Sequence, residues 1–325
     1  MARDKLTAIL LVVFKVKINK KGLLIVAAGS LSACLLGIVF LYGLNTSFQE
    51  EVDDGYNAIY SHLFIDPSMN GVAEVKRNVS YCNTTSTLQR LDVYTPKKSD
   101  AARPVVVYIH GGGWSSGDKA NPFVTEYGAE IVRNDMAFIS INYRLAPQDI
   151  YPAQNQDVDC ALSYIVTHSS ELNIDASKLA VIGDSAGGEL ASMAALTSAS
   201  KSVIRAVVDF YGPADIWAQI NRTPRPDVWA INYIGSATDE ATAKQASPAY
   251  ATLTGAPPFL IMHGTNDKTV HYDQSSTFAA QLKSAGVDVT LVPVQNAGHY
   301  FSAKSQPTIK QVEIQMIAFL RQHLL

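Results

Sequence analysis

Short apolar runs alternate with longer helix-compatible stretches along the second two thirds of the chain, and this alternation constrains the fold most strongly. The clearest runs are rich in β-branched residues and bounded by Gly, Pro or Asp, as strands are. They are residues 105–109, 137–141, 179–182, 204–210, 259–262 and 287–293. The helix-compatible stretches are residues 153–168, 186–198, 272–285 and 307–323. Continuous apolar strands covered by helices on both faces predict an α/β fold with a mostly parallel central sheet.

Composition and charge suit a globular protein that does not bind nucleic acid. The 325 residues are 47% hydrophobic and 17% charged, which is enough apolar material for one large core. Lys and Arg number 26 against 29 Asp and Glu, so there is no basic excess to follow a phosphate backbone. We therefore expect no nucleic-acid partner.

The first 70 residues differ in character from the rest. Residues 22–44 carry no charge and are long enough, as a helix, to cross the roughly 30 Å hydrocarbon core of a bilayer. Six basic residues precede this run and four acidic residues follow it, an asymmetry that keeps the N-terminus in the cytoplasm. We predict a cytoplasmic basic segment at 1–21, a transmembrane anchor at 22–44, a linker at 45–70 and a folded domain at 71–325. That domain would face the periplasmic or extracellular side.

Two alternatives to an uncleaved anchor remain open. One is a cleaved signal peptide, although the apolar run is long for that class. The other is a lipoprotein, because Leu31-Ser32-Ala33-Cys34 resembles the lipobox of bacterial lipoproteins. The apolar residues after Cys34 depart from the polar tether expected there.

The other two cysteines are Cys82 and Cys160. Three scattered cysteines are too few for a structural zinc site or a disulfide framework. A single Cys82–Cys160 bridge and two unlinked thiols are both compatible with the sequence, because it does not give the separation of the two Cα atoms.

A glycine-flanked serine follows the apolar run at 179–182 and precedes a helix-compatible stretch. Gly183-Asp184-Ser185-Ala186-Gly187 fits the G-x-S-x-G pattern of a strand-to-helix turn that exposes a nucleophilic serine. Such a turn is crowded unless the positions two before and two after the serine lack side chains. An ordinary glycine-rich turn is the simpler alternative, but the position between strand and helix favours Ser185 as a nucleophile.

A nucleophilic serine needs a histidine base and a carboxylate that orients the histidine. His299 lies in a loop between the last apolar run and the final helical stretch, and Asp267 lies in a turn after the run at 259–262. Both sites are at carboxyl ends of expected strands, where parallel sheets place their ligands. His110 and His263 are competing candidates. The chain order Ser185, Asp267, His299 matches that of an α/β-hydrolase sheet, and we predict this triad.

A run of three glycines follows the strand expected at 105–109. It begins after His110 and ends before Trp114, and it lets the backbone approach a reacting carbonyl. We expect the amide N–H groups of Gly112, Gly113 and Ala186 to form an oxyanion hole. A phosphate-binding loop is the rival, but no Gly-Lys-Ser/Thr follows. Since metal-ligand motifs such as HExxH are absent as well, we expect neither a metal nor an organic cofactor.

Five motifs together resemble those of α/β-hydrolase esterases, namely HGGGW at 110–114, NYRLAP at 142–147, GDSAGG at 183–188, HGTND at 263–267 and NAGHYF at 296–301. The resemblance is to the hormone-sensitive-lipase-like and feruloyl-esterase-like carboxylesterases, and it covers roughly residues 70–325. It implies an α/β-hydrolase fold with a small cap and hydrolysis of a small-molecule carboxylic ester through an acyl-enzyme on Ser185. The N-terminal cap is shorter here than in hormone-sensitive-lipase-like proteins, and the predicted anchor is a further departure.

Two other functions use the same fold. A serine peptidase or amidase would employ the same triad, whereas a non-catalytic binding protein would be expected to have lost part of it. Every triad position is present in this chain. Residues 213–251 form the main insertion between expected strands, and they are too few to build a large lid over the site. Because a small lid offers little apolar surface for a long acyl chain, we predict a preference for short-chain or aryl esters. Natural substrate and oligomeric state stay open.

Overall fold

The structure is a computed structural model that describes residues 73–82, 86–97, 101–301 and 305–325. The predicted segments 1–21, 22–44 and 45–70, and with them the alternatives at Cys34, lie outside the described residues. Within the described ranges, no helix combines the length and the apolar character needed to cross a membrane.

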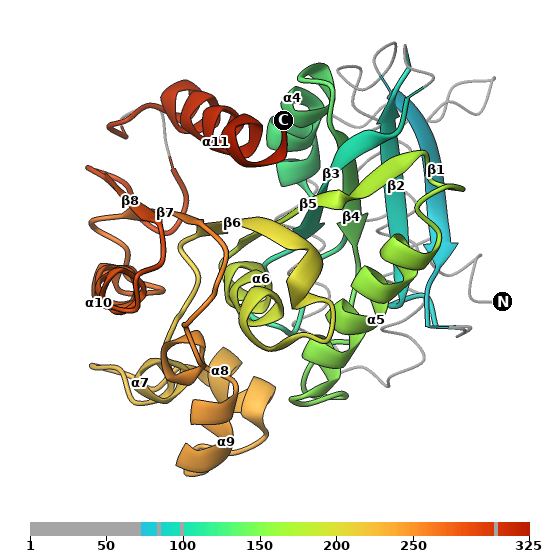
Figure 1. Cartoon of the computed structure of the whole chain (residues 1–325). Coiled ribbons are helices and arrows are strands. Elements are labelled where there is room, and N and C mark those ends of the chain that lie inside the picture. Colours follow the sequence, from blue (N-terminus) through green and yellow to red (C-terminus); the bar gives the residue numbers. More distant parts are fainter. Residues whose placement is uncertain (1–72, 83–85, 98–100, 302–304) are drawn as a thin grey trace, which may run out of the picture. The chain divides into compact units, whose positions relative to one another are not determined.

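An eight-stranded sheet with the order β1-β2-β4-β3-β5-β6-β7-β8 organises the domain (Figure 1). β1 pairs with β2 and β2 with β4 in antiparallel fashion, and every other pair is parallel. The mostly parallel sheet predicted from the sequence is therefore confirmed. The strands are β1 Ala73–Ser80, β2 Arg90–Pro96, β3 Arg103–Ile109, β4 Ala137–Ile141, β5 Ile174–Asp184, β6 Ile204–Phe210, β7 Phe259–Gly264 and β8 Val289–Val294.

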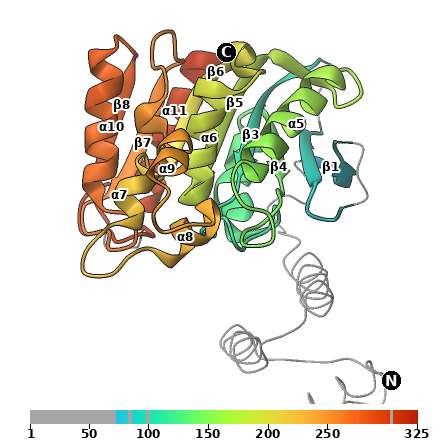
Figure 2. The ribbon, with the colours of Figure 1, turned by 90° about the horizontal axis from the view of Figure 1, so that it is seen from below.

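Helices cover both faces of the sheet. In Figures 1 and 2, α5, α6 and α10 lie on one face, and α4 and α11 lie on the other. Alternate residues of β3 show why: Val105 and Val107 belong to the core cluster of the first face, and Val106 and Tyr108 to that of the second. The helices are α4 Ala129–Arg133, α5 Ala153–Thr167, α6 Ala186–Thr197, α10 Tyr272–Ser284 and α11 Ile309–Leu324.

One strand is longer than predicted, and two short helical elements were not predicted. β5 begins at Ile174 rather than near residue 179, since Ile174 and Asp175 continue the pairing with β3 across a register shift. Asp175, Ser177 and Lys178 are polar and conceal the first part of this strand in the sequence. A short π-helical turn at Val124–Gly128 leads into α4, and neither was predicted because each spans only five residues.

The insertion between β6 and β7 folds into three short helices, α7 Ile216–Ile220, α8 Val228–Ile234 and α9 Glu240–Gln245. Each starts at an aspartate whose side chain accepts hydrogen bonds from the first-turn amides; these are Asp215, Asp227 and Asp239. Gly235 ends α8 in the left-handed conformation that favours glycine. We refer to this insertion, α7 to α9, as the cap.

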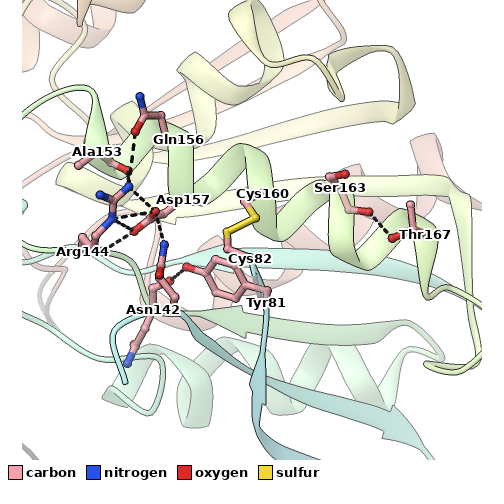
Figure 3. Close-up of a disulfide and its surroundings, with 11 residues drawn as sticks. Tyr81, Cys82, Asn142, Arg144, Ala153, Gln156, Asp157, Cys160, Ser163 and Thr167 are labelled. Carbon is pink, nitrogen blue, oxygen red and sulfur yellow. Dashed lines mark hydrogen bonds and ion pairs between the residues drawn. A yellow bond between two sulfur atoms is a disulfide. The ribbon is translucent and has the colours of Figure 1, made fainter. Parts of the chain in front are cut away.

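A disulfide joins Cys82, just after β1, to Cys160 on α5 (Figure 3). Their Cα atoms are 5.7 Å apart, within the range that a disulfide spans. Of the two alternatives that the sequence allowed, the structure has the bridge. It ties the edge hairpin of the sheet to a helix that packs on the sheet face.

The NYRLAP motif supports the same region of the fold. Arg144 donates to both carboxylate oxygens of the buried Asp157 on α5, at 2.8–3.0 Å (Figure 3). Asn142 donates to Asp118, and the buried Tyr143 donates its hydroxyl hydrogen to the His110 carbonyl. These contacts give the motif a structural role.

Candidate active site

Ser185 occupies the sharp turn between β5 and α6 with φ 51° and ψ −121°. A positive φ is strained for a residue with a side chain, and the surrounding packing must hold it. A Cβ on Gly183 would lie 2.1 Å from the Gly187 carbonyl oxygen, and one on Gly187 would lie 2.0 Å from that of Ile109. The backbone can close around the serine because both flanking positions are glycine.

Ser185, His299 and Asp267 come together in a line of hydrogen bonds. The Nε2 atom of His299 is 2.9 Å from the Ser185 Oγ atom, and its Nδ1 atom is 2.7 Å from Asp267 Oδ2. Ser185 follows β5, Asp267 follows β7 and His299 follows β8. Since the carboxyl ends of parallel strands share one edge of the sheet, residues 114 positions apart in the sequence meet there.

Asp267 is buried and surrounded by donors. Its Oδ1 atom accepts the amide N–H groups of Thr269, at 2.7 Å, and Val270, at 3.0 Å. Burial alone would raise the pKa of Asp267, but hydrogen bonds from His263 and His299 and from the Thr269 amide hold that pKa well below its usual value. Asp267 is therefore ionised at neutral pH and can fix the tautomer in which His299 Nε2 accepts a proton.

Asp184 ties the glycine loop after β3 to the turn that holds Ser185. The Asp184 carboxylate accepts the Gly111 amide at 2.9 Å and the Tyr108 hydroxyl at 2.7 Å. Gly112 and Gly113 have positive φ angles of 118° and 61°, which glycine adopts readily. Sequence reasoning assigned Asp184 no role, although its position directly before the serine in GDSAGG was a signal.

The predicted oxyanion donors lie on this loop and at the start of α6. Within the described part of the chain, no acceptor engages the amide N–H of Gly112, Gly113 or Ala186. These N–H groups are free to meet a developing negative charge, and their role stays a prediction.

The competing histidines occupy other places. His110 is buried, its ring stacks on Tyr143 at 4.3 Å, and burial lowers its pKa. His263 is fully buried and approaches Asp267, with its Nε2 atom 3.2 Å from Asp267 Oδ2. His299 is therefore the histidine that bonds Ser185.

Two of the aromatic residues near the site are packing residues. The Trp114 ring stacks on Tyr233 with a centroid distance of 4.4 Å, and its indole N–H donates to the buried Glu189. Tyr211 is buried with its ring 4.8 Å from that of His299. Trp114 therefore packs against Tyr233, and Tyr211 packs against His299.

Two other aromatic side chains are exposed beside it. Trp229 of α8 is 51% exposed, and its Cβ and Cγ atoms lie 3.0 Å from the position that a Cβ on Gly113 would take. Tyr300 is 71% exposed with its ring 5.2 Å from that of His299. One exposed aromatic side chain thus lies beside Gly113, and another lies beside His299.

The groups that meet at Ser185 are a hydroxyl, an imidazole and a carboxylate. This set can move a proton from the serine to the histidine and stabilise the imidazolium that forms. Among the residues that the structure describes, no group of three or more His, Cys, Asp or Glu side chains could hold a metal ion.

The chain is similar in sequence to known esterases and similar in fold to a solved esterase structure. The chain is 30% identical over 234 residues to carboxylesterase NlhH of Mycobacterium tuberculosis, which covers 66% of this chain and 71% of the relative. It is 24% identical over 245 residues to the isoprenylcysteine alpha-carbonyl methylesterase ICME of Arabidopsis thaliana, covering 70% of this chain and 56% of that protein. The chain thus spans about half the length of several curated relatives that it matches.

A solved structure of a truncated carbohydrate esterase from gut microbiota superposes with a TM-score of 0.69 at 26% identity, covering 78% of this chain and 96% of that one. These similarities confirm the resemblance to α/β-hydrolase esterases. A family model described as BD-FAE matches residues 91–282, which is more than half of the 325 residues. The chain belongs to the BD-FAE family.

Proposed function

We propose that this chain is a serine carboxylesterase that hydrolyses small carboxylic esters through an acyl-enzyme on Ser185. The observation that carries the proposal is the continuous hydrogen-bonded line from Ser185 through His299 to Asp267. The relatives named carboxylesterase and methylesterase support the same reaction class.

The proposed reaction is a two-step acyl transfer. As the Ser185 oxygen attacks the ester carbonyl, His299 Nε2 takes the hydroxyl proton, and the ionised Asp267 stabilises the imidazolium. The amides of Gly112, Gly113 and Ala186 would hold the oxyanion. His299 then gives its proton to the departing alcohol. Water, activated in the same way, releases the acid and restores the serine.

The cap favours short-chain or aryl esters. Of its hydrophobic residues, Ile216 and Ile234 are buried in the core, whereas Val228 and Trp229 are exposed. An acyl chain gains about 0.8 kcal/mol for each CH₂ group only where an apolar tunnel buries it. We expect kcat/KM for p-nitrophenyl esters to be highest from acetate to butyrate and to decline by octanoate. A steady rise through decanoate would contradict this proposal.

The test of the nucleophile is the Ser185→Ala variant. It should lose ester turnover and labelling by a fluorophosphonate probe while it unfolds at the same urea concentration as the wild type. Ser177→Ala is the matched control, because Ser177 is a β5 serine whose hydroxyl bonds Asp175. Turnover retained in a folded Ser185→Ala protein would exclude Ser185 as nucleophile.

We also propose that residues 22–44 anchor the chain with residues 71–325 on the extracytoplasmic side. The Cys82–Cys160 disulfide supports this, because disulfides persist in oxidising compartments. The full-length protein should remain with membranes after a high-salt wash, and a variant starting at Thr46 should be soluble and active. Recovery of the full-length chain in the soluble fraction would count against the anchor, and palmitate labelling that requires Cys34 would favour the lipoprotein.

A further inference from the structure

Asp267 accepts hydrogen bonds from two histidines, and the second of them, His263, has no part in the reaction described so far. His263 lies on β7 and is fully buried. Its Nε2 atom is 3.2 Å from Asp267 Oδ2 and 2.9 Å from the Val270 carbonyl oxygen. Its Nδ1 atom is 2.7 Å from the hydroxyl of Ser275, which is buried on α10. A buried chain of hydrogen bonds thus continues from Asp267 through His263 to Ser275.

The partners of His263 determine where its protons lie. Both groups that face Nε2 are acceptors, a carboxylate and a carbonyl, so Nε2 must carry a hydrogen. In the neutral imidazole Nδ1 is then an acceptor, and the Ser275 hydroxyl donates to it. His263 therefore donates its Nε2–H to Asp267, and the hydroxyl of Ser275 holds the ring in that orientation.

The other titratable groups around His263 come from three elements. Asp209 is at the end of β6, and burial raises its pKa to about 6. Tyr211 follows that strand with its ring 6.4 Å from the imidazole, and Tyr272 of α10 lies at 5.7 Å. His299 faces His263 across Asp267. These groups surround His263 but leave the hydrogen bond to Asp267 as its direct connection to the triad.

We infer that His263 and Ser275 are positioning residues of the Ser185 site, an inference that rests on the function proposed above. Backbone amides fix Asp267 Oδ1, and the hydrogen bond from His263 fixes Oδ2 in the direction of His299. His263 also draws part of the carboxylate charge toward itself. Without it, the carboxylate can rotate and presents more negative charge to His299, which then binds its proton more tightly.

His263→Leu tests the inference, because leucine fills the space and donates nothing. This variant should lower kcat roughly 10- to 100-fold, the effect of one hydrogen bond to a charged group, with KM changed less than about twofold. The acid limb of its pH–rate profile should move to higher pH. His263→Gln should recover most of the activity and the wild-type profile, because its side-chain amide can donate to Asp267.

Ser275→Ala removes a single oxygen, and it tests the positioning role of His263 and Ser275 even if His263→Leu does not fold. It should lower kcat several-fold without changing KM. Ser276→Ala is the matched control, because the Ser276 hydroxyl bonds only the nearby Asp273 carbonyl within the described residues. We expect this control to match the wild type in both constants.

Two results would overturn the inference. One is a folded His263→Leu protein, or a Ser275→Ala protein, with wild-type kcat and pH profile. The other is a His263→Gln protein as impaired as His263→Leu, since the histidine would then only fill space. If the wild type hydrolyses no ester, the proposed function fails, and the inference is tested by the low-field proton resonance of His299 Nδ1–H. That resonance should shift in His263→Leu and Ser275→Ala, and an unchanged resonance in both would refute the positioning role.

Discussion

Replacing Asp267 with asparagine should disable the site by reversing one hydrogen bond. The amides of Thr269 and Val270 both donate to one oxygen of this side chain, so the amide oxygen of an asparagine must take that place. Its NH₂ group then points at His299 Nδ1, which has to accept. The ring proton moves to Nε2, and Nε2 can no longer receive the proton of Ser185.

The expected loss in kcat is about 10⁴-fold, or about 5 kcal/mol of transition-state stabilisation, the size of effect known for this exchange in serine proteases. The folded state should also lose about 1–3 kcal/mol, because the same NH₂ group meets the N–H of His263. The assay is p-nitrophenyl acetate turnover with urea unfolding of the same samples. Asp273→Asn, at an exposed position in the first turn of α10, is the control. A kcat within tenfold of the wild type would refute the reasoning.

Three further predictions concern stability. Gly187→Ala would place a Cβ 2.0 Å from a β3 carbonyl oxygen, so we expect it to lower the free energy of unfolding, measured in urea, by at least about 3 kcal/mol. Gly286→Ala is the control: its Cβ would have no atom within 4 Å, so it should lower the free energy of unfolding by only about 1–2 kcal/mol, for its positive φ alone. Changing Cys82 and Cys160 to serine opens a loop of 78 residues and should lower the free energy of unfolding by about 4 kcal/mol, and an unchanged urea midpoint would contradict this. Burial raises the pKa of Asp209 from 3.8 to about 6, so its stabilising contribution is present below pH 3.8 and is lost as the pH rises through 6. The wild type should therefore lose about 2 kcal/mol relative to Asp209→Asn between pH 4 and pH 7, and a constant difference would show that this carboxyl is not perturbed.

Much of the fold could be predicted because its signals are local. A buried parallel strand needs apolar side chains on both faces, so β4 and β6 appear in the sequence as mostly apolar runs with their observed bounds. The turn at Ser185 requires glycines two positions before and two positions after the serine, and this requirement is visible in the five consecutive residues 183–187. β5 was predicted too short because Asp175, Ser177 and Lys178 interrupt the apolar pattern after its first residue, Ile174.

The sequence by itself determined the α/β alternation and the three residues that meet at the site, because strand-end positions and chain order follow from residues close together in the chain. Only the tertiary structure decided the order in which the strands pair, with β3 between β4 and β5. It alone decided that Cys82 meets Cys160, that Trp229 lies against Gly113, and that Asp267 has a second histidine behind it. The first two of these contacts join distant residues through packing that no local periodicity encodes. His263 is four residues from Asp267, but its role depends on Ser275 of α10, which packing brings to its other side.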